Sequence, residues 1–172
     1  LPILNSAIRA GIPQDAVGME PNLAFTLGTA SPHVVDIASA YSTFAAEGLQ
    51  VKPTYIKLIK TTAGDTLYQY KVQTTQAFTP EVSATVTYAL QQVVRSGTGT
   101  AAQALGRPCA GKTGTTNDNK SALFAGYTPQ MAAAVMLTKD GLFQWPATSC
   151  HPVLRALAPK LIALIALLIN FF

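Results

Sequence analysis

The sequence predicts an α+β fold in which helices pack on an antiparallel sheet. Three segments carry apolar residues at helical spacing and each ends at a glycine. Short β-rich runs follow one another across turn residues with no helix between them, which favours antiparallel pairing. The chain has 172 residues, of which 49% are hydrophobic and 12% charged, and this length suffices for one domain with a core.

Three helices are expected. Residues 1–13, "LPILNSAIRAGIP", place apolar residues at helical spacing before a glycine and a proline that end the run. Residues 31–48 open with a Ser-Pro pair, a capping serine followed by proline in the first helical position. Residues 79–97 repeat this start with Thr-Pro-Glu and stop at a glycine. Residues 18–30 are rich in turn formers, so we expect irregular structure there.

Five strands are expected, in two groups. The runs at 54–60, "TYIKLIK", and 66–72, "TLYQYKV", flank a short Gly-Asp turn and predict a hairpin. The runs at 109–113, 121–127 and 132–138 follow one another, and the Asn/Asp cluster after the first suits a tight turn. Short turns join antiparallel neighbours, so these three runs predict one sheet. The glycine-rich connection before them is expected to be flexible.

Several conspicuous side chains have simple structural interpretations. We expect His33 at the surface, Cys109 packed on a buried strand, and Asp118 in a turn. A set of aromatic residues is expected in the core or packed against a sheet, namely Tyr41, Phe44, Tyr68, Tyr70 and Phe124.

Composition argues against several kinds of partner. The net charge is +4 and the basic residues are scattered, so we expect no nucleic acid. Cys109 and Cys150 form no C-x-x-C pair, and His151 has no spaced histidine partner, so we expect no metal site and no cofactor. The chain starts at Leu1 without a signal-peptide pattern, and we expect a piece of a longer protein.

The segment "GRPCAGKTGTT", residues 106–116, has two interpretations. Gly106, followed by Gly111, Lys112 and Thr113, matches the pattern of a phosphate-binding P-loop. A P-loop lies between a buried strand and a helix whose N-terminus holds the phosphates. The residues before Gly106 lack a β-branched run, and "GTTNDNK" after Thr113 favours a turn over a helix. The P-loop match is therefore a coincidence.

The second interpretation places Lys112, Thr113 and Thr115 on a strand that leads into a hairpin. Strand side chains alternate, so Thr113 and Thr115 share one face, opposite to Lys112, unless the strand is bulged. Gly114 has no side chain and lets a ligand lie against the backbone. A cation, hydroxyl groups and an exposed strand edge suit the carboxylate of a peptide bound in extended form.

Lys112, Thr113 and Gly114 form a Lys-Thr-Gly triplet, and longer stretches around this triplet carry a family resemblance. They are "LGRPCAGKTGTTNDNKSALFAGYTP" at 105–129, "SPHVVDIASAYSTFAAEG" at 31–48, "VKPTYI" at 51–56 and "VVRSGTGTAA" at 93–102. In order and spacing they resemble the transpeptidase domain of class A (bifunctional) penicillin-binding proteins of the actinobacterial type. The resemblance covers residues 1–140. It implies the C-terminal part of a penicillin-binding protein/serine β-lactamase-like transpeptidase fold.

The resemblance implies a role in cell-wall synthesis. In this family a serine of a Ser-x-x-Lys motif attacks the D-Ala-D-Ala end of a peptidoglycan stem peptide and releases D-Ala. The acyl group then passes to the amine of a neighbouring stem, and β-lactam antibiotics acylate the same serine. The expected ligands are therefore stem peptides and β-lactams. The parent protein is expected to be membrane-anchored at the extracytoplasmic face of the plasma membrane.

The resemblance also assigns roles to the triplet. Lys112 would orient the substrate carboxylate and assist proton transfer, and Thr113, Gly114 and Thr115 would bind substrate. The Thr115 N–H would be one donor of the oxyanion hole. No Ser-x-x-Lys or Ser-x-Asn motif occurs in this chain, and the family carries both N-terminal to the matched region. We expect a D,D-transpeptidase fragment that is inactive alone. The alternative is a non-catalytic peptidoglycan-peptide-binding or interaction module.

Residues 141–172 are expected to lie outside the family pattern. No Asp or Glu occurs after Asp140, and the run "LIALIALLINFF" at 161–172 is uncharged. An altered reading frame would produce such a change of composition. A membrane or interface helix is the alternative, although the uncharged run is shorter than the roughly 20 residues that a spanning helix needs.

Overall fold

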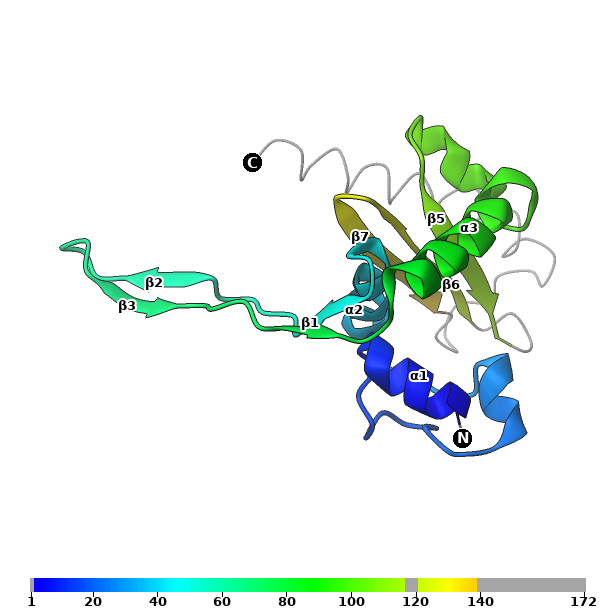
Figure 1. The fold of residues 1–172 in the computed structure, drawn as a ribbon, viewed down its shortest axis with the longest axis horizontal. Helices are drawn as coiled ribbons and strands as arrows, with labels where there is room; N and C mark the ends of the chain where they lie inside the picture. The colour runs from blue at the N-terminus through cyan, green and yellow to red at the C-terminus, as the bar shows by residue number, and fades with distance from the viewer. Residues whose placement is uncertain (1, 117–120, 139–172) are drawn as a thin grey trace.

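The computed structural model describes residues 2–116 and 121–138 (Figure 1). The helices and 3-10 helices are α1 (Pro2–Ala10), η1 (Leu23–Leu27), α2 (Val34–Ala45), α3 (Pro80–Ser96) and η2 (Thr100–Leu105). The strands are β1 (Leu49–Val51), β2 (Leu58–Lys60), β3 (Thr66–Gln69), β4 (Thr74–Gln76), β5 (Ala110–Thr115), β6 (Ser121–Thr128) and β7 (Met131–Thr138). The α+β prediction is confirmed.

The main sheet has the strand order β5-β6-β7, and both strand pairs are antiparallel. Its register places Thr113 opposite Phe124 and Phe124 opposite Val135, with no shift along either pair. The three predicted strands are therefore confirmed. The turn predicted around Asp118 lies outside the described residues.

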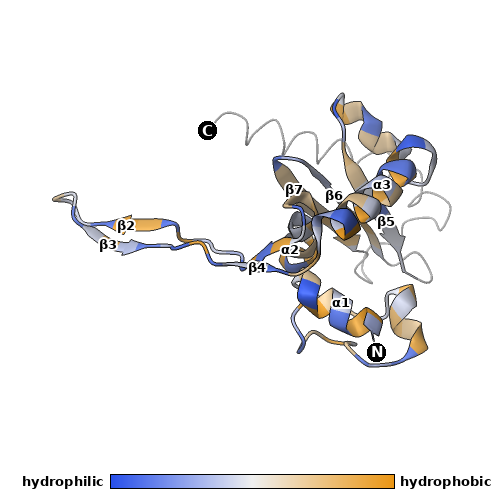
Figure 2. Cartoon of the chain, viewed as in Figure 1, coloured by the Kyte–Doolittle hydropathy of each residue, from blue (hydrophilic) through white to orange (hydrophobic). Residues whose placement is uncertain are grey.

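Helices α2 and α3 pack on this sheet. Helix α2 contacts β6 and β7, α3 contacts β5, and the two helices also contact each other (Figure 1). Figure 2 shows that much of the sheet is coloured toward the hydrophobic end of the scale. One buried cluster joins α3, η2 and the sheet through Val94, Ala102 and Phe124, with partly buried neighbours Leu105, Cys109, Ala133 and Val135.

Helix α3 begins and ends as predicted. The Thr79 hydroxyl accepts the N–H of Val82 at 3.4 Å, and proline fills the first helical position. Gly97 follows the last turn and donates its N–H to Val93 O. The connection after α3, expected to be flexible, instead forms the 3-10 helix η2. A second 3-10 helix, η1, lies within the segment expected to be irregular.

The predicted start of α2 is wrong by two residues. Its N-cap is His33, whose N–H donates to the Asp36 carboxylate at 3.1 Å, and the helix begins at Val34. Ser31 donates its N–H to Val17 O at 2.7 Å in an isolated β-bridge. Ser31 thus takes part in a contact with a residue distant in the sequence and does not cap the helix. Local capping preference does not reveal such a contact.

Residues 49–76 form a two-stranded β-arm that projects from the body (Figure 1). Strands β2 and β3 pair antiparallel, which confirms the predicted hairpin, although both are shorter than expected. The pair β1–β4 at its root was not predicted. Every residue of β2 and β3 is exposed, because no second layer of the described structure covers the arm.

The predicted packing aromatics divide between body and arm. Phe124 is 3% exposed, and Tyr41 and Phe44 pack against other aromatic rings in the body. Tyr68 lies on the arm and is 43% exposed, so the expectation of packing is wrong for this residue. Tyr70 is half-buried and donates its hydroxyl to Lys52 O at 3.0 Å.

Candidate functional site

Strand β5 carries the four predicted site residues. It begins buried, at Ala110, and becomes exposed toward the hairpin that joins it to β6. Lys112 and Thr115 are exposed, and Thr113 and Gly114 are half-buried. In the described sheet β5 has one neighbour only, β6, so its other edge is open.

The hydrogen-bond pattern shows which backbone groups face that open edge. Antiparallel strands alternate between residue pairs that exchange both backbone bonds and pairs that exchange none. The Thr116 N–H donates to Ser121 O at 3.0 Å, so the next pair, Thr115 with Ala122, exchanges none. The N–H and C=O groups of Thr115 and Thr113 therefore point away from β6, toward the open edge.

The Lys112 side chain lies along this edge. Its ammonium donates to Thr113 O at 2.8 Å, which is one of the outward-pointing carbonyls. Because the register with β6 has no bulge, Lys112 and Thr113 project to opposite faces of the strand. The Lys112 ammonium and the outward-pointing N–H groups of Thr113 and Thr115 thus come together only at the open edge. A ligand that contacts the ammonium and these N–H groups must lie along β5.

Thr113 is held by a residue that the sequence analysis did not single out. Thr98 Oγ1 lies 2.5 Å from Thr113 Oγ1, a contact that ties the end of α3 to β5. Gly97 and Gly99, on either side of Thr98, both donate their N–H groups to Val93 O, at 3.1 and 3.0 Å. The sequence feature that could have identified Thr98 is its position between two glycines directly after a helix.

Gly114 differs from the glycine at the other end of the strand. A Cβ at Gly111 would lie 2.6 Å from Phe124 Cζ and 2.9 Å from Ala125 O, so packing requires glycine there. A Cβ at Gly114 would meet only the Leu123 side chain, at 3.6 Å or more, which is an ordinary contact. The described fold has no steric need for glycine at Gly114.

The same geometry rules out the phosphate-loop interpretation. Lys112 lies within a strand, and the strand leads into a second strand, not into a helix. No helix N-terminus is therefore aligned with the glycines of this segment to hold a phosphate.

Comparison with known proteins assigns the family. The model of the penicillin binding protein transpeptidase domain matches residues 5–156. The chain belongs to the penicillin-binding protein transpeptidase family. Members of this family act in cell-wall synthesis, and the chain carries part of such a domain.

Curated relatives are similar over most of the chain. Penicillin-binding protein 1F of Bacillus subtilis is 36% identical over 70% of this chain, which is 18% of that protein. Penicillin-binding protein 1A of Mycolicibacterium smegmatis is 34% identical over 75% of the chain, which is 17% of that protein. The chain therefore spans less than a fifth of the length of these relatives.

Solved structures share the fold. PonA1 of Mycobacterium tuberculosis superposes with a TM-score of 0.75 at 26% identity, over 91% of this chain and 48% of the PonA1 chain. The PonA1 complex with penicillin V gives a TM-score of 0.71 over the same shares. This transpeptidase fragment thus corresponds to about half of the PonA1 chain in those structures.

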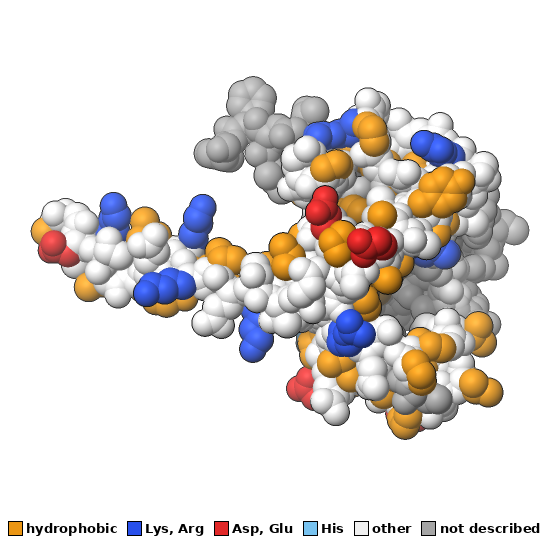
Figure 3. Space-filling view, in the orientation of Figure 1, with side chains coloured by type: hydrophobic (Ala, Val, Ile, Leu, Met, Phe, Trp, Pro, Cys, Tyr) orange, Lys and Arg blue, Asp and Glu red, His pale blue; other side chains and the backbone are white. Residues whose placement is uncertain are grey.

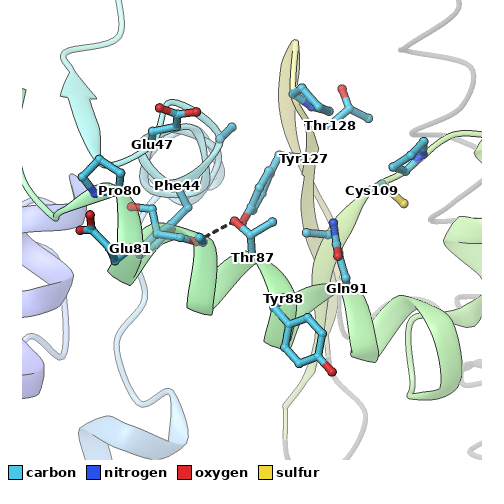
Figure 4. Close-up of a pocket in the computed structure, with 16 residues that line it drawn as sticks. Phe44, Glu47, Pro80, Glu81, Thr87, Tyr88, Gln91, Cys109, Tyr127 and Thr128 are labelled. Carbon is cyan, nitrogen blue, oxygen red and sulfur yellow. Dashed lines mark hydrogen bonds between the residues drawn. The ribbon is translucent and has the colours of Figure 1, made fainter.

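A cavity of about 670 Å³ lies elsewhere in the transpeptidase fragment, between the end of α2, the first half of α3 and the start of β5 (Figure 4). None of residues 112–115 lines it. Thr87 and Tyr127 cross it with a 2.7 Å hydrogen bond between their hydroxyl groups, and Glu47 and Glu81 lie at one side (Figure 4). This cavity is therefore distinct from the open edge of β5.

The remaining candidate residues have structural places. Cys109 is half-buried against the Val94–Ala102–Phe124 cluster, and burial raises the pKa of its thiol, so the packing interpretation is confirmed. His33 is an exposed N-cap, as expected. Within residues 2–116 and 121–138, no group of three His, Cys, Asp or Glu side chains is placed to hold a metal ion. Over the same residues, no helix has the length and apolar content to cross a membrane.

Proposed function

We propose that the open edge of β5 binds the terminal carboxylate of a peptidoglycan stem peptide in a D,D-transpeptidase. One observation carries the proposal: at this edge the Lys112 ammonium and the outward-pointing amides of Thr113 and Thr115 lie together beside Gly114. The family assignment supports it. The PonA1 structure with penicillin V supports a β-lactam as a second ligand of the same edge.

The peptide would add to the sheet as a further strand. An extended backbone along β5 pairs with the N–H and C=O groups of Thr113, and its carboxylate meets the Lys112 ammonium and the hydroxyls of Thr113 and Thr115. Gly114 lets the peptide approach the strand without a side chain between them. The Lys112 ammonium donates to Thr113 O in this structure, so the carboxylate would replace that contact.

The Thr115 N–H would stabilise the transition state of acyl transfer. A serine hydroxyl, which this chain does not supply, forms an ester with the penultimate D-Ala carbonyl as the C–N bond to the last D-Ala breaks. The released amine takes up the proton that the serine loses. A stem-peptide amine then attacks the ester carbonyl and forms an amide as the C–O bond to the serine breaks, and the serine oxygen takes up the proton that this amine loses. An amide aimed at the carbonyl oxygen is typically worth about 2.7–4 kcal/mol in such a transition state.

The complete protein would work in the cell envelope, anchored to the membrane, because its substrate is the cell wall. The chain itself, without Ser-x-x-Lys, would bind but not react. In this proposal the complete protein supplies the nucleophile outside this chain. A non-catalytic wall-binding module would have the binding edge and no nucleophile.

The test uses the complete protein that contains this chain. Lys112→Ala should slow covalent labelling by a fluorescent penicillin at least about tenfold, since one charge-assisted contact to the carboxylate is lost. Lys60→Ala is the matched control, because it removes another exposed lysine, one that lies on the β-arm. Equal labelling rates for the two variants would refute the site.

A mass measurement separates the two functions. The 172-residue chain incubated with penicillin should gain no mass, whereas the complete protein should gain one penicillin per molecule. A complete protein that binds penicillin reversibly and never gains mass would favour the non-catalytic module.

A further inference from the structure

The β-arm exposes an unusual set of side chains for a surface ribbon. Seven large apolar residues along it are between 41% and 87% exposed: Tyr55, Ile56, Leu58, Ile59, Leu67, Tyr68 and Val72. Two-stranded ribbons are marginally stable in water when nothing covers them. Exposed apolar groups gathered on one projecting element indicate an interaction surface.

The arm is also strongly basic. Residues 49–76 contain four lysines, Lys52, Lys57, Lys60 and Lys71, and a single acid, Asp65. Lys57 and Lys60 flank Leu58 and Ile59 in the sequence, and the register of β2 with β3 shifts between Ile59 and Lys60. Lysine and aliphatic side chains therefore lie next to one another along the arm. Figure 3 shows these basic groups distributed along the arm.

The body carries the complementary surface. The cavity of about 670 Å³ is lined by the aromatic residues Phe44, Tyr88 and Tyr127 and by two carboxylates, Glu47 and Glu81. In Figure 4 both carboxylates lie on the side of the cavity formed by Phe44 and Pro80. Figure 3 shows acidic groups on the face of the body near the root of the arm. An apolar and acidic hollow thus matches an apolar and basic ribbon.

We propose that two copies of this chain associate by exchanging arms, with the β-arm of each copy docked at the acidic cavity of the other. Glu47 precedes the arm and Glu81 follows it in the sequence, so the cavity lies at the root of the arm. If the arms of the two copies run antiparallel to each other, the outer half of each arm lies at the root of the other copy's arm. The result is a two-fold symmetric contact in which each pair of surfaces is used twice.

The tip of the arm argues against a lipid surface as the occupant. The turn at residues 61–65 is polar and closed by Thr61 and Asp65, whose backbone groups bond at 2.8 Å. An arm that entered a bilayer tip first would bury the Asp65 carboxylate, which is costly. The apolar residues lie on the flanks of the ribbon, where a protein surface can cover them.

Charge reversal tests the exchange, with sedimentation velocity over a concentration series as the measurement. Lys57→Glu with Lys60→Glu on the arm should weaken the dimer at least about tenfold, as should Glu47→Lys with Glu81→Lys at the cavity. The four changes together should restore dimerisation. The arm variant lowers the net charge from +4 to zero, so general charge repulsion alone predicts tighter association for it, the opposite result.

Four outcomes would overturn the proposal. The first is a monomer at all concentrations, and the second is self-association that neither pair of changes alters. The third is failure of the variant with all four changes to recover dimerisation. The fourth is binding of the monomer to anionic vesicles, if the changes on the arm abolish that binding. The proposal does not depend on the assignment of Lys112, so either can fail alone.

Discussion

The two parts of strand β5, residues 110–111 and residues 112–115, differ in their surroundings. Ala110 and Gly111 are buried and fit against β6, whereas Lys112 to Thr115 are exposed or half-buried along an open edge. Each part contains one glycine, but only Gly111 is surrounded so closely that a Cβ would clash. The first part holds the strand in the fold, and the second part lies exposed or half-buried along the open edge.

The opposite strand shows the same division. Gly126 lies opposite Gly111, and a Cβ there would lie 2.8 Å from the ring of Phe124, so both glycines make room for this one side chain. Leu123 lies opposite Gly114, and a Cβ at Gly114 would make only an ordinary van der Waals contact with it. A glycine is therefore informative about function only after its neighbours are known.

The largest expected effect comes from filling the buried part. Gly111→Val should lower the free energy of unfolding by an amount at the upper end of the roughly 1–3 kcal/mol typical of overpacking, because Phe124 is 3% exposed and has little room to move. Chemical denaturation followed by circular dichroism would measure the change.

Gly114→Val is the matched control in the exposed part. It should leave the free energy of unfolding within about 1 kcal/mol of the parent chain, because the site is open and valine suits a strand. In the complete protein the same change should slow penicillin labelling. Equal destabilisation by the two substitutions would remove the contrast between the two parts.

A smaller effect is expected from alkaline pH, again at the buried end. Burial, with a lesser contribution from Tyr127, raises the pKa of Tyr41 to about 12, and burial also raises the pKa of Tyr127. Above the ordinary pKa of 10, the unfolded state loses a proton that the folded state keeps. Stability is therefore full below pH 10 and falls toward pH 12, by at most about 1.4 kcal/mol per pH unit for one tyrosine.

Denaturation at pH 9 and pH 11 would measure this loss. Tyr41→Phe should make the stability less dependent on pH across this interval. Tyr55→Phe, at a residue that is 87% exposed on the β-arm, should leave the dependence unchanged. An identical pH dependence in both variants would contradict the raised pKa of Tyr41.

The sequence predicted most of the fold because its local patterns agree with the structure. Thr79-Pro80 starts α3 and Gly97 follows its end, since capping and proline geometry are local properties. The start of α2 was misplaced because Ser31 is used in a bridge to Val17, a contact between distant residues. The root of the arm was missed because a pair of three-residue strands carries little periodicity.

The sequence indicated which residues of the candidate site share a strand, but not the geometry of its edge. Alternation along a strand indicated the faces of Lys112 and Thr113, and the unshifted register of β5 with β6 agrees with that expectation. Which edge is open, and which amides point to it, depends on pairing with β6. Thr98 was not singled out, because its contact with Thr113 joins residues 15 positions apart.

The smallest expected change in stability tests that contact. Thr98→Val removes the hydroxyl that lies 2.5 Å from Thr113 Oγ1 and keeps a similar shape. Both residues retain access to water, so the free energy of unfolding should fall by no more than about 1 kcal/mol. In the complete protein, however, the Thr113 hydroxyl would lose its fixed orientation toward the ligand carboxylate. We expect penicillin to bind more weakly before it reacts, with less change in the acylation rate of the bound complex.

Thr98→Ser provides the matched control, because it keeps a hydroxyl at the same position. It should behave like the parent protein in both stability and labelling, whereas Thr98→Val should require a higher penicillin concentration for half-maximal labelling. A purely structural role would affect stability and leave that concentration unchanged. Since Thr98 lies on the connection after α3 and Thr113 on β5, a concentration shift specific to the valine variant would show that the exposed part of the strand is positioned from outside the sheet.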